Sequence, residues 1–404
     1  MISEPPIPEN EFNRILDLSE LDLDYTNLEK NFKDLTKLAA WVAGTDISLL
    51  NLIDSFTQWT ISNYGLPIEQ MPREESVCQY TIMEDDKFEV QNLTLDDRFK
   101  DKPYVVDHPQ VRYYFGVPLK TKNGNNIGAL CVLDTNVKVL TPEKIEMLKV
   151  IADEIVNRLM ALKAIQTLTH NVTETKEVNK RLAHDIRGPI GGIIGLAQII
   201  SEKGDKNTLS EVLEFINLIQ KSGNSLLELA DEILNSEVKA SQKNPELKDH
   251  ELNLQLFKDK LEKLYLPQAK NKEIDFTVTL NPANGIVPFP KNKLLQITGN
   301  LISNAIKFTP PHGRVSTHLD IELGKETKTL FIEVSDSGVG LTSKGIEDIL
   351  SGSSSSSANG TKGEQGYGFG LPLVKFLIDS FDGSMSITSS PGAGTSFRIT
   401  LPIK

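Results

Sequence analysis

The stretch that decides the architecture of this chain is LAHDIRGPIGGIIGLAQII, residues 182–200. Its apolar residues recur at steps of three or four, which predicts a helix with one buried face. These residues are Leu182, Ile186, Ile190, Ile193, Ala197 and Ile200. His184 lies two residues from its apolar neighbours on either side, so we expect its side chain to point toward solvent.

Three glycines share the predicted face of His184 and leave it without side chains: Gly188, Gly191 and Gly195. Each glycine costs a helix about 1 kcal/mol relative to alanine, so helix stability does not explain them. We expect a surface that admits another domain, and a helix end or loop is the alternative. Pro189 cannot donate to the carbonyl of Asp185, which predicts a bend within one turn of His184.

His184 has the surroundings of a nucleophile. Of the six histidines in the chain, it alone combines a position inside a helix, an adjacent acid and a proline five residues on. Attack by one ring nitrogen leaves the ring positively charged, and Asp185 can accept a ring N–H or take its proton. A solvated surface acid is the alternative reading of Asp185.

The helical pattern extends on both sides of this stretch. Residues 141–182 carry one apolar stripe with polar flanks, and residues 209–238 predict a second amphipathic helix after a polar break. A single long helix cannot bury its stripe alone, so we expect a coiled coil with a second copy over 141–182. The hairpin of residues 172–242 would form half of a dimeric four-helix bundle. The alternative is a linker helix that packs on its own domain.

Composition limits the classes of protein. The net charge of −12 argues against nucleic-acid binding, and no apolar run reaches the roughly 18 residues that span a bilayer. The acidic, proline-rich start lacks a signal-peptide pattern, so we expect a soluble, cytoplasmic protein. Cys78 and Cys131 fit a reducing compartment and are expected to be buried thiols rather than a metal site.

The flanking regions predict two further domains, so the fold class is multidomain α+β. Residues 1–140 mix a helix near 27–43 with strands near 46–54, 88–93, 111–121 and 126–135. A polar linker over 241–250 precedes an α/β region at 250–404. Its expected elements are a helix at 252–270, strands at 273–280, 314–323 and 329–336, and a hairpin of 384–389 with 395–401.

This last region holds three motifs that suit a nucleotide. Asn300, Asn304 and Lys307 step by four and three and so share one face of a helix. A carboxamide oxygen suits Mg²⁺, and a lysine suits phosphate. An Asp-x-Gly-x-Gly turn follows a strand at Asp336, Gly338 and Gly340. A glycine-rich loop then leads into a helix near 372–379, which predicts an anion site; its residues are Gly366, Gly368, Gly370 and Leu371. Alone, either glycine motif could be an ordinary turn.

Together the four motifs, in this order, resemble the transmitter of two-component sensor histidine kinases over residues 172–404. The resemblance implies a dimerisation and phosphoacceptor domain, then an α/β-sandwich GHKL-type ATPase domain that binds ATP and Mg²⁺. It makes Asn304 the Mg²⁺ ligand with help from Asn300, and it assigns phosphate to Lys307 and the adenine amino group to Asp336. Residues 343–365, with the serine run 351–357, match the position of the mobile ATP lid. Gly188 stands where many relatives carry Thr or Asn, so phosphatase activity stays open.

Residues 1–140 resemble a GAF domain. The carrying segments are 73–78, 97–99, 111–119 and 128–134. The resemblance implies a fold rather than a ligand, and a small-molecule pocket or a dimerisation module are the main alternatives. A chromophore anchored at Cys78 and a redox role for the two cysteines are less favoured.

The expected function is ATP-dependent autophosphorylation of His184 under control of the GAF domain. The phosphoryl group would then pass to a separate response-regulator receiver. Two rivals remain: a GHKL ATPase of the chaperone or topoisomerase type, and a degenerate kinase that only docks partners.

Overall fold

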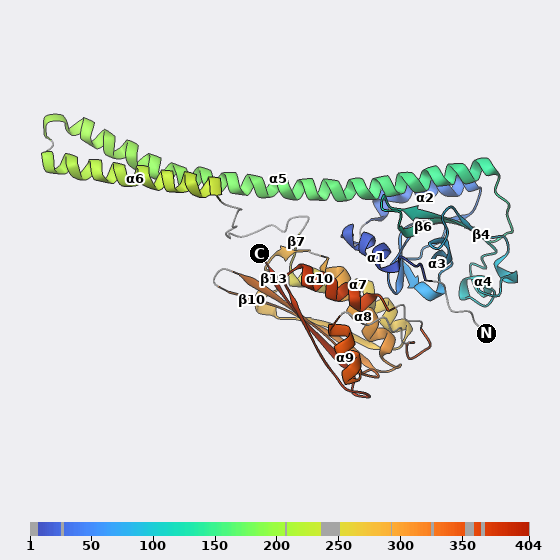
Figure 1. Cartoon of the computed structure of the whole chain (residues 1–404). Helices are drawn as coiled ribbons and strands as arrows, with labels where there is room; N and C mark the ends of the chain where they lie inside the picture. The colour runs from blue at the N-terminus through green and yellow to red at the C-terminus, as the bar shows by residue number, and fades with distance from the viewer. Residues whose placement is uncertain are drawn as a thin grey trace. The chain divides into compact units, whose positions relative to one another are not determined.

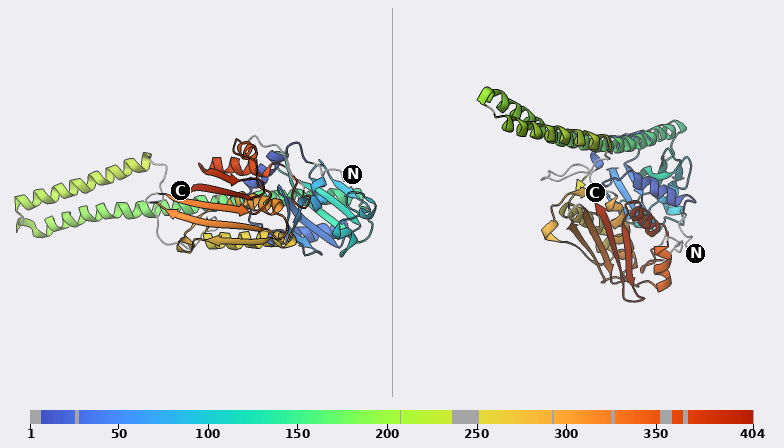
Figure 2. Two further views of the ribbon diagram at one scale, coloured as in Figure 1. Left: turned by 90° about the horizontal axis from the view of Figure 1, so that it is seen from below. Right: turned by 60° about the vertical axis from the view of Figure 1, so that its left-hand side comes forward.

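The computed structural model describes residues 7–25, 28–206, 208–235, 251–291, 293–324, 327–351, 359–364 and 368–403 (Figures 1 and 2). The chain divides into two compact units. One comprises residues 1–163 with 247–404, and the other comprises residues 164–246.

The second unit is a helical hairpin. Helix α5 (Pro142–Lys203) starts in the first unit and continues without a break past Pro189, and η3 (Gly204–Lys206) leads to α6 (Leu209–Asn235), which runs back beside it (Figure 1). Thr208 and Glu211 form a capping box: the Thr208 hydroxyl accepts the amide of Glu211, and the Glu211 carboxylate accepts the amide of Thr208. The predicted pair of helices is confirmed. Ile151, Ile155 and Leu159 of the stripe predicted to form a coiled coil are buried in the core of the first unit, so over this part of α5 the alternative of a helix packed on its own domain applies. The alternative that the glycines near His184 end a helix is wrong, because all three lie inside α5. No helix within the described ranges combines the length and the apolar character that a membrane span needs.

Within the first unit, the part before α5 resembles a GAF domain in sequence, and we call it the sensor region. It contains a six-stranded sheet in the order β3-β2-β1-β6-β5-β4, with every neighbouring pair antiparallel. The strands are β1 (Ile47–Ile53), β2 (Thr57–Tyr64), β3 (Gln70–Pro72), β4 (Phe88–Val90), β5 (Tyr113–Lys120) and β6 (Asn126–Asp134). The helices are α1 (Glu11–Glu20), α2 (Glu29–Ala43), η1 (Arg73–Glu75), α3 (Cys78–Thr81), η2 (Leu93–Leu95) and α4 (Pro103–Val106). The central strands are buried on both faces because α1 and α2 cover one side, and α3 covers the other.

In this region the sequence analysis missed α1, β2, β3, α3, α4 and the two short 3₁₀ helices. In β2 the apolar residues are Trp59, Ile61 and the terminal Tyr64, and the polar residues from Thr57 to Ser62 are buried as well, so the strand is too polar to be recognised as a buried one.

The C-terminal region contains a five-stranded sheet in the order β12-β13-β11-β10-β8, in which β8 and β10 run parallel. The strands are β8 (Asp275–Leu280), β10 (Arg314–Leu323), β11 (Lys328–Asp336), β12 (Ser384–Ser389) and β13 (Thr395–Ile403). Burial alternates along β8, β10 and β13, so only one face of the sheet is covered. The helices that pack on this sheet are α7 (Leu254–Asn271), α8 (Leu294–Phe308) and α10 (Gly370–Ser380).

Four short elements complete this region. Two are the short strands β7 (Glu251–Leu252) and β9 (Phe289–Pro290), which pair with each other. The other two are η4 (Pro282–Asn284) and α9 (Ser343–Leu350). Helix α9 lies at the start of the segment that the sequence predicts to be a lid.

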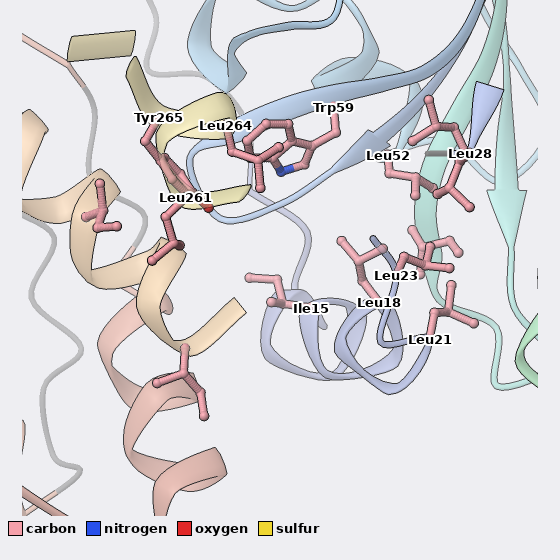
Figure 3. Close-up of a cluster of buried hydrophobic side chains, with 14 of the residues drawn as sticks. Ile15, Leu18, Leu21, Leu23, Leu28, Leu52, Trp59, Leu261, Leu264 and Tyr265 are labelled. Carbon is pink, nitrogen blue, oxygen red and sulfur yellow. The ribbon is translucent and has the colours of Figure 1, made fainter. Parts of the chain in front are cut away.

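One apolar core runs from the sensor region into the C-terminal region. Trp59 of β2 lies against Tyr265 and near Leu264 of α7, and Ile15 of α1 belongs to the same cluster (Figure 3). A second cluster lies on the opposite face of the sensor sheet and includes Cys78 and Cys131, whose sulfur atoms are 3.8 Å apart. Both cysteines are free and buried, which confirms the prediction of two buried thiols.

Candidate nucleotide site and phosphoacceptor helix

Helix α8 places the three residues of the first nucleotide motif in the interior of the C-terminal region. Asn300, Asn304 and Lys307 are 4%, 7% and 6% exposed. The helix is held between α7 and α10 and lies on β10 and β11. Side chains with polar atoms are seldom this buried without hydrogen-bond partners, so we consider which partner each polar atom has.

Two of these polar atoms have no partner among the described residues. The side-chain amide of Asn300 donates to the carbonyl of Gln296 at 3.0 Å, but its Oδ1 oxygen accepts nothing. Nδ2 of Asn304 is also buried and unpaired. Leaving a buried polar atom unsatisfied costs about 1–3 kcal/mol, so the pair is typical of a site that awaits a ligand. An unpaired carboxamide oxygen on this face fits the donor set of a Mg²⁺ ion.

The ammonium group of Lys307 lies over two aromatic rings. Its Nζ atom is 5.4 Å from the ring centre of Phe56 and 5.0 Å from that of Phe308. Burial lowers the pKa of the Lys307 ammonium to about 8. Phe56 comes from the turn between β1 and β2, and the sequence analysis did not find it, because nothing in the local pattern joins it to α8.

Lys272, a second lysine near the site, was not found by the sequence analysis. The Nζ atom of Lys272 donates to the backbone carbonyl of Lys307 at 2.5 Å, and it forms an ion pair with Glu364. Thr361, beside Glu364, donates its amide to the same carbonyl at 3.1 Å. Residues 359–364, which belong to the predicted lid, are therefore fastened to the C-terminal end of α8.

Asp336 is the last residue of β11, and hydrogen bonds hold its carboxylate. The Oδ1 oxygen accepts the amide of Gly338 at 2.8 Å and the amide of Thr395 at 3.2 Å. Burial raises the pKa of this carboxyl. The other oxygen of a carboxylate held in this way can accept the amino group of a base.

The glycines of this turn permit close approach of backbone to backbone. A Cβ atom at Gly338 would lie 2.4 Å from the carbonyl oxygen of Phe308. Gly340 has a φ of +70°, and its Cβ would lie 2.0 Å from the carbonyl oxygen of Ser390. The turn after β11 therefore packs against the end of α8 and against the β12–β13 turn.

The third motif also reaches α8. Gly366 lies outside the described residues. Gly368 has a φ of +76°, Gly370 is the first residue of α10, and Leu371 follows it. The helix thus starts two residues earlier than predicted. A Cβ at Gly370 would lie 2.9 Å from Oδ1 of Asn300. The structure therefore brings the three predicted nucleotide motifs together around one helix.

The phosphoacceptor motif lies on α5. The backbone of His184 and Asp185 belongs to this helix, but their side chains are outside what the structure describes, so the outward direction of His184 stays a prediction. Cβ atoms at Gly188, Gly191 and Gly195 would meet no atom within 4 Å. This is the open surface that the glycine spacing predicts.

Comparison with protein families gives three matches. Residues 27–159 match the GAF domain, residues 175–237 match the His kinase A phospho-acceptor domain, and residues 290–404 match the histidine kinase-, DNA gyrase B- and HSP90-like ATPase domain. The chain has the domain architecture of a sensor histidine kinase. This confirms the predicted family and implies ATP binding by its last domain. An ATPase of the chaperone or topoisomerase type does not account for the phospho-acceptor domain of a sensor histidine kinase.

Similar proteins share parts of the chain. A 228-residue segment, 55% of this chain, is 33% identical to the autoinducer 2 sensor kinase/phosphatase LuxQ of Vibrio parahaemolyticus and covers 26% of that protein. A 164-residue segment, 40% of this chain, is 35% identical to a cyclic di-GMP phosphodiesterase of Pseudomonas aeruginosa and covers 28% of it. The chain thus spans about a quarter of the length of these curated relatives. The catalytic domain of the histidine kinase ThkA matches 39% of this chain and 96% of its own at 21% identity, with a TM-score of 0.30.

Proposed function

We propose that this chain is an ATP-dependent protein-histidine kinase that phosphorylates its own His184 and passes the phosphoryl group to an aspartate of a separate response-regulator receiver. The convergence of three nucleotide motifs on α8, in a chain that also carries a phospho-acceptor helix, supports this most directly. A cytoplasmic location is part of the proposal, because the kinase needs the ATP of that compartment.

In this proposal each motif has one task toward the nucleotide. The Asp336 carboxylate accepts the adenine amino group, and its two backbone hydrogen bonds fix its direction. Lys307 and the amides at the start of α10 bind phosphate. Asn304, helped by Asn300, holds Mg²⁺. When bound, this ion offsets negative charge on the phosphate oxygens.

The transfer step forms one bond and breaks one. A ring nitrogen of His184 attacks the γ-phosphorus, the new N–P bond replaces the bond to the β–γ bridging oxygen, and ADP leaves with that electron pair. Asp185 takes the proton from the other ring nitrogen, which leaves the ring of the phosphohistidine neutral while the phosphoryl group keeps its negative charge.

A homodimer is part of the proposal. Several apolar side chains of α5 and α6 are exposed in the single chain; they are Ile190, Ile194, Leu213, Ile216 and Leu227. Two copies that pair these helices would bury them in a four-helix bundle. The open glycine face would then remain available to the receiver.

Labelling with γ-³²P-ATP tests the proposal. We expect the full chain to acquire label that survives alkali and is lost in acid, which is the stability of a phosphohistidine. His184→Gln and Asn304→Ala should abolish it, and His170→Gln, an equivalent change on the same helix, should retain it. Labelled protein should then lose its label to a purified receiver domain. Release of free phosphate without labelled protein would instead indicate an ATPase, and the absence of both would indicate a docking protein.

A further inference from the structure

The turn between β1 and β2 of the sensor region reaches the proposed nucleotide site. We call residues 54–56 the sensor tip. A Cβ atom at Gly370 would lie 2.9 Å from Cε2 of Phe56 and equally close to Oδ1 of Asn300. The ring of Phe56 also lies 5.4 Å from the Lys307 ammonium. The ring therefore stands among the groups that would bind the phosphates and the Mg²⁺ ion.

The sensor tip is held in place by the sensor's own fold. The Arg14 guanidinium donates to the carbonyl of Ile53 at 2.6 Å, and the amide of Arg73 donates to the carbonyl of Phe56 at 2.9 Å. Both guanidinium groups pair with Glu11, and all three side chains are fully buried. Because the turn is ordered by these groups, Phe56 is presented without further loss of conformational freedom on docking.

Apolar and polar contacts beside the sensor tip join the sensor region to α7 of the C-terminal region. Trp59 meets Tyr265 edge to face, with ring centres 5.9 Å apart, and Trp59 is 3% exposed (Figure 3). Gln70 donates to the carbonyl of Leu264 at 2.8 Å, and Gln268 donates to Oε1 of Gln70 at 2.7 Å. These contacts hold α7, and through it α8, against the sensor sheet.

Ion pairs complete the contact. Lys260 of α7 pairs with Asp24, and Lys293, just before α8, pairs with Glu20 at 2.6 Å. Sensor contacts thus lie along α7 and at both ends of α8, where the nucleotide site is built.

We propose that the sensor tip is an autoinhibitory plug, so that the docked sensor and the triphosphate of ATP compete for one place. This inference rests on the proposed function, because it takes the face of Asn300 and Lys307 as the nucleotide site. Release of the sensor by its stimulus frees Lys307 and Asn300, and ATP then binds. Because coupling is reciprocal, ATP must also weaken docking by the same factor.

The test compares nucleotide affinity in full-length variants, by titration with a fluorescent ATP analogue. Phe56→Ala removes the plug. Asp24→Lys places two cations together and loosens docking away from the site. If the docked form is the main population, each change should tighten binding roughly tenfold or more, because apparent affinity is reduced by the competent fraction. Trp41→Ala, a truncation on the exposed side of α2, should leave affinity unchanged.

Hydrogen exchange of the β1–β2 peptide supplies the reciprocal measurement. Saturating ATP should speed exchange at residues 54–57 in the wild type. Wild-type affinity in both variants, with no change in exchange, overturns the inference while leaving the kinase intact. Tighter binding of ATP in Phe56→Ala, but not in Asp24→Lys, would show that Phe56 itself causes the inhibition and would support competition between the sensor tip and the triphosphate. Failure of every form to bind nucleotide overturns the proposed function, and this inference with it.

Discussion

Two glycines in the β12–β13 turn allow the packing around Asp336 to be tested by one matched pair of substitutions. Gly392 and Gly394 have φ values of +80° and +79°, so alanine at either position has the left-handed penalty of roughly 1–2 kcal/mol. They differ in surroundings. A Cβ at Gly392 meets nothing within 4 Å, whereas at Gly394 it lies 1.9 Å from the backbone oxygen of Asp336.

Gly394→Ala must therefore push the β12–β13 turn away from Asp336. Steric overpacking of this kind adds about 1–3 kcal/mol beyond the penalty that both variants share. Each 1.4 kcal/mol is a factor of ten, so local opening should differ roughly five- to 150-fold between the variants. The displaced turn leads directly into Thr395, the first residue of β13, whose amide holds the Asp336 carboxylate.

Hydrogen exchange of peptides from β11 and β13 measures the opening, and titration with a fluorescent ATP analogue measures the function. We expect Gly394→Ala to lose protection and at least tenfold in nucleotide affinity, and Gly392→Ala to retain affinity. Equal losses in the two variants would refute the reasoning, because the shared backbone penalty would then be the whole effect.

Three further predictions concern charged groups. Asp336→Asn should weaken ATP binding roughly ten- to 100-fold, since a hydrogen bond to a charged acceptor is lost; GTP binding, measured in the same titration, should change little. Burial, to which Phe56 of the sensor tip contributes, lowers the pKa of Lys307 to about 8, so the docked form with a neutral lysine becomes more favourable as pH rises past 8. The ATP affinity of the wild type should therefore fall between about pH 8 and 10.5, and the affinity of Phe56→Ala should not. Glu74, Glu364 and Lys272 are the other charged groups that face Lys307. Although burial opposes ionisation, Arg14 and Arg73 hold the pKa of Glu11 at about 2. Its ionic stabilisation is complete above about pH 4.5 and is lost as pH falls through 2, and Glu11→Gln should cost about 3–5 kcal/mol in urea unfolding followed by tryptophan fluorescence. Urea midpoints that match the wild type at pH 7 would contradict the last prediction.

The sequence predicted what depends on local periodicity. The face shared by Asn300, Asn304 and Lys307 follows from helical spacing alone, and the long helix through His184 follows from one apolar stripe. Phe56 and Lys272 could not be found in this way, because each reaches the site from another element and depends on tertiary packing. The Thr395 amide that holds Asp336 belongs to a strand 59 residues later. Backbone donors of this kind leave no signature in residue type.

The strength of the contacts suits a reversible plug. The Lys293–Glu20 pair is partly exposed, and such pairs contribute about 0–1 kcal/mol. The Trp59–Tyr265 pair adds about 0.5–1.5 kcal/mol beyond its burial. In contrast, the Glu11–Arg14–Arg73 cluster that shapes the tip is fully buried and lies wholly within the sensor. Undocking breaks these pairwise contacts and also exposes the apolar surface of Trp59 and Tyr265, which are 3% and 4% exposed, but it leaves the cluster around Glu11 intact. A difference of about 5.5 kcal/mol moves a population from 1:99 to 99:1, so this is the preference for the undocked form that a stimulus must supply to reverse a fully docked population, with the cost of the exposed apolar surface included.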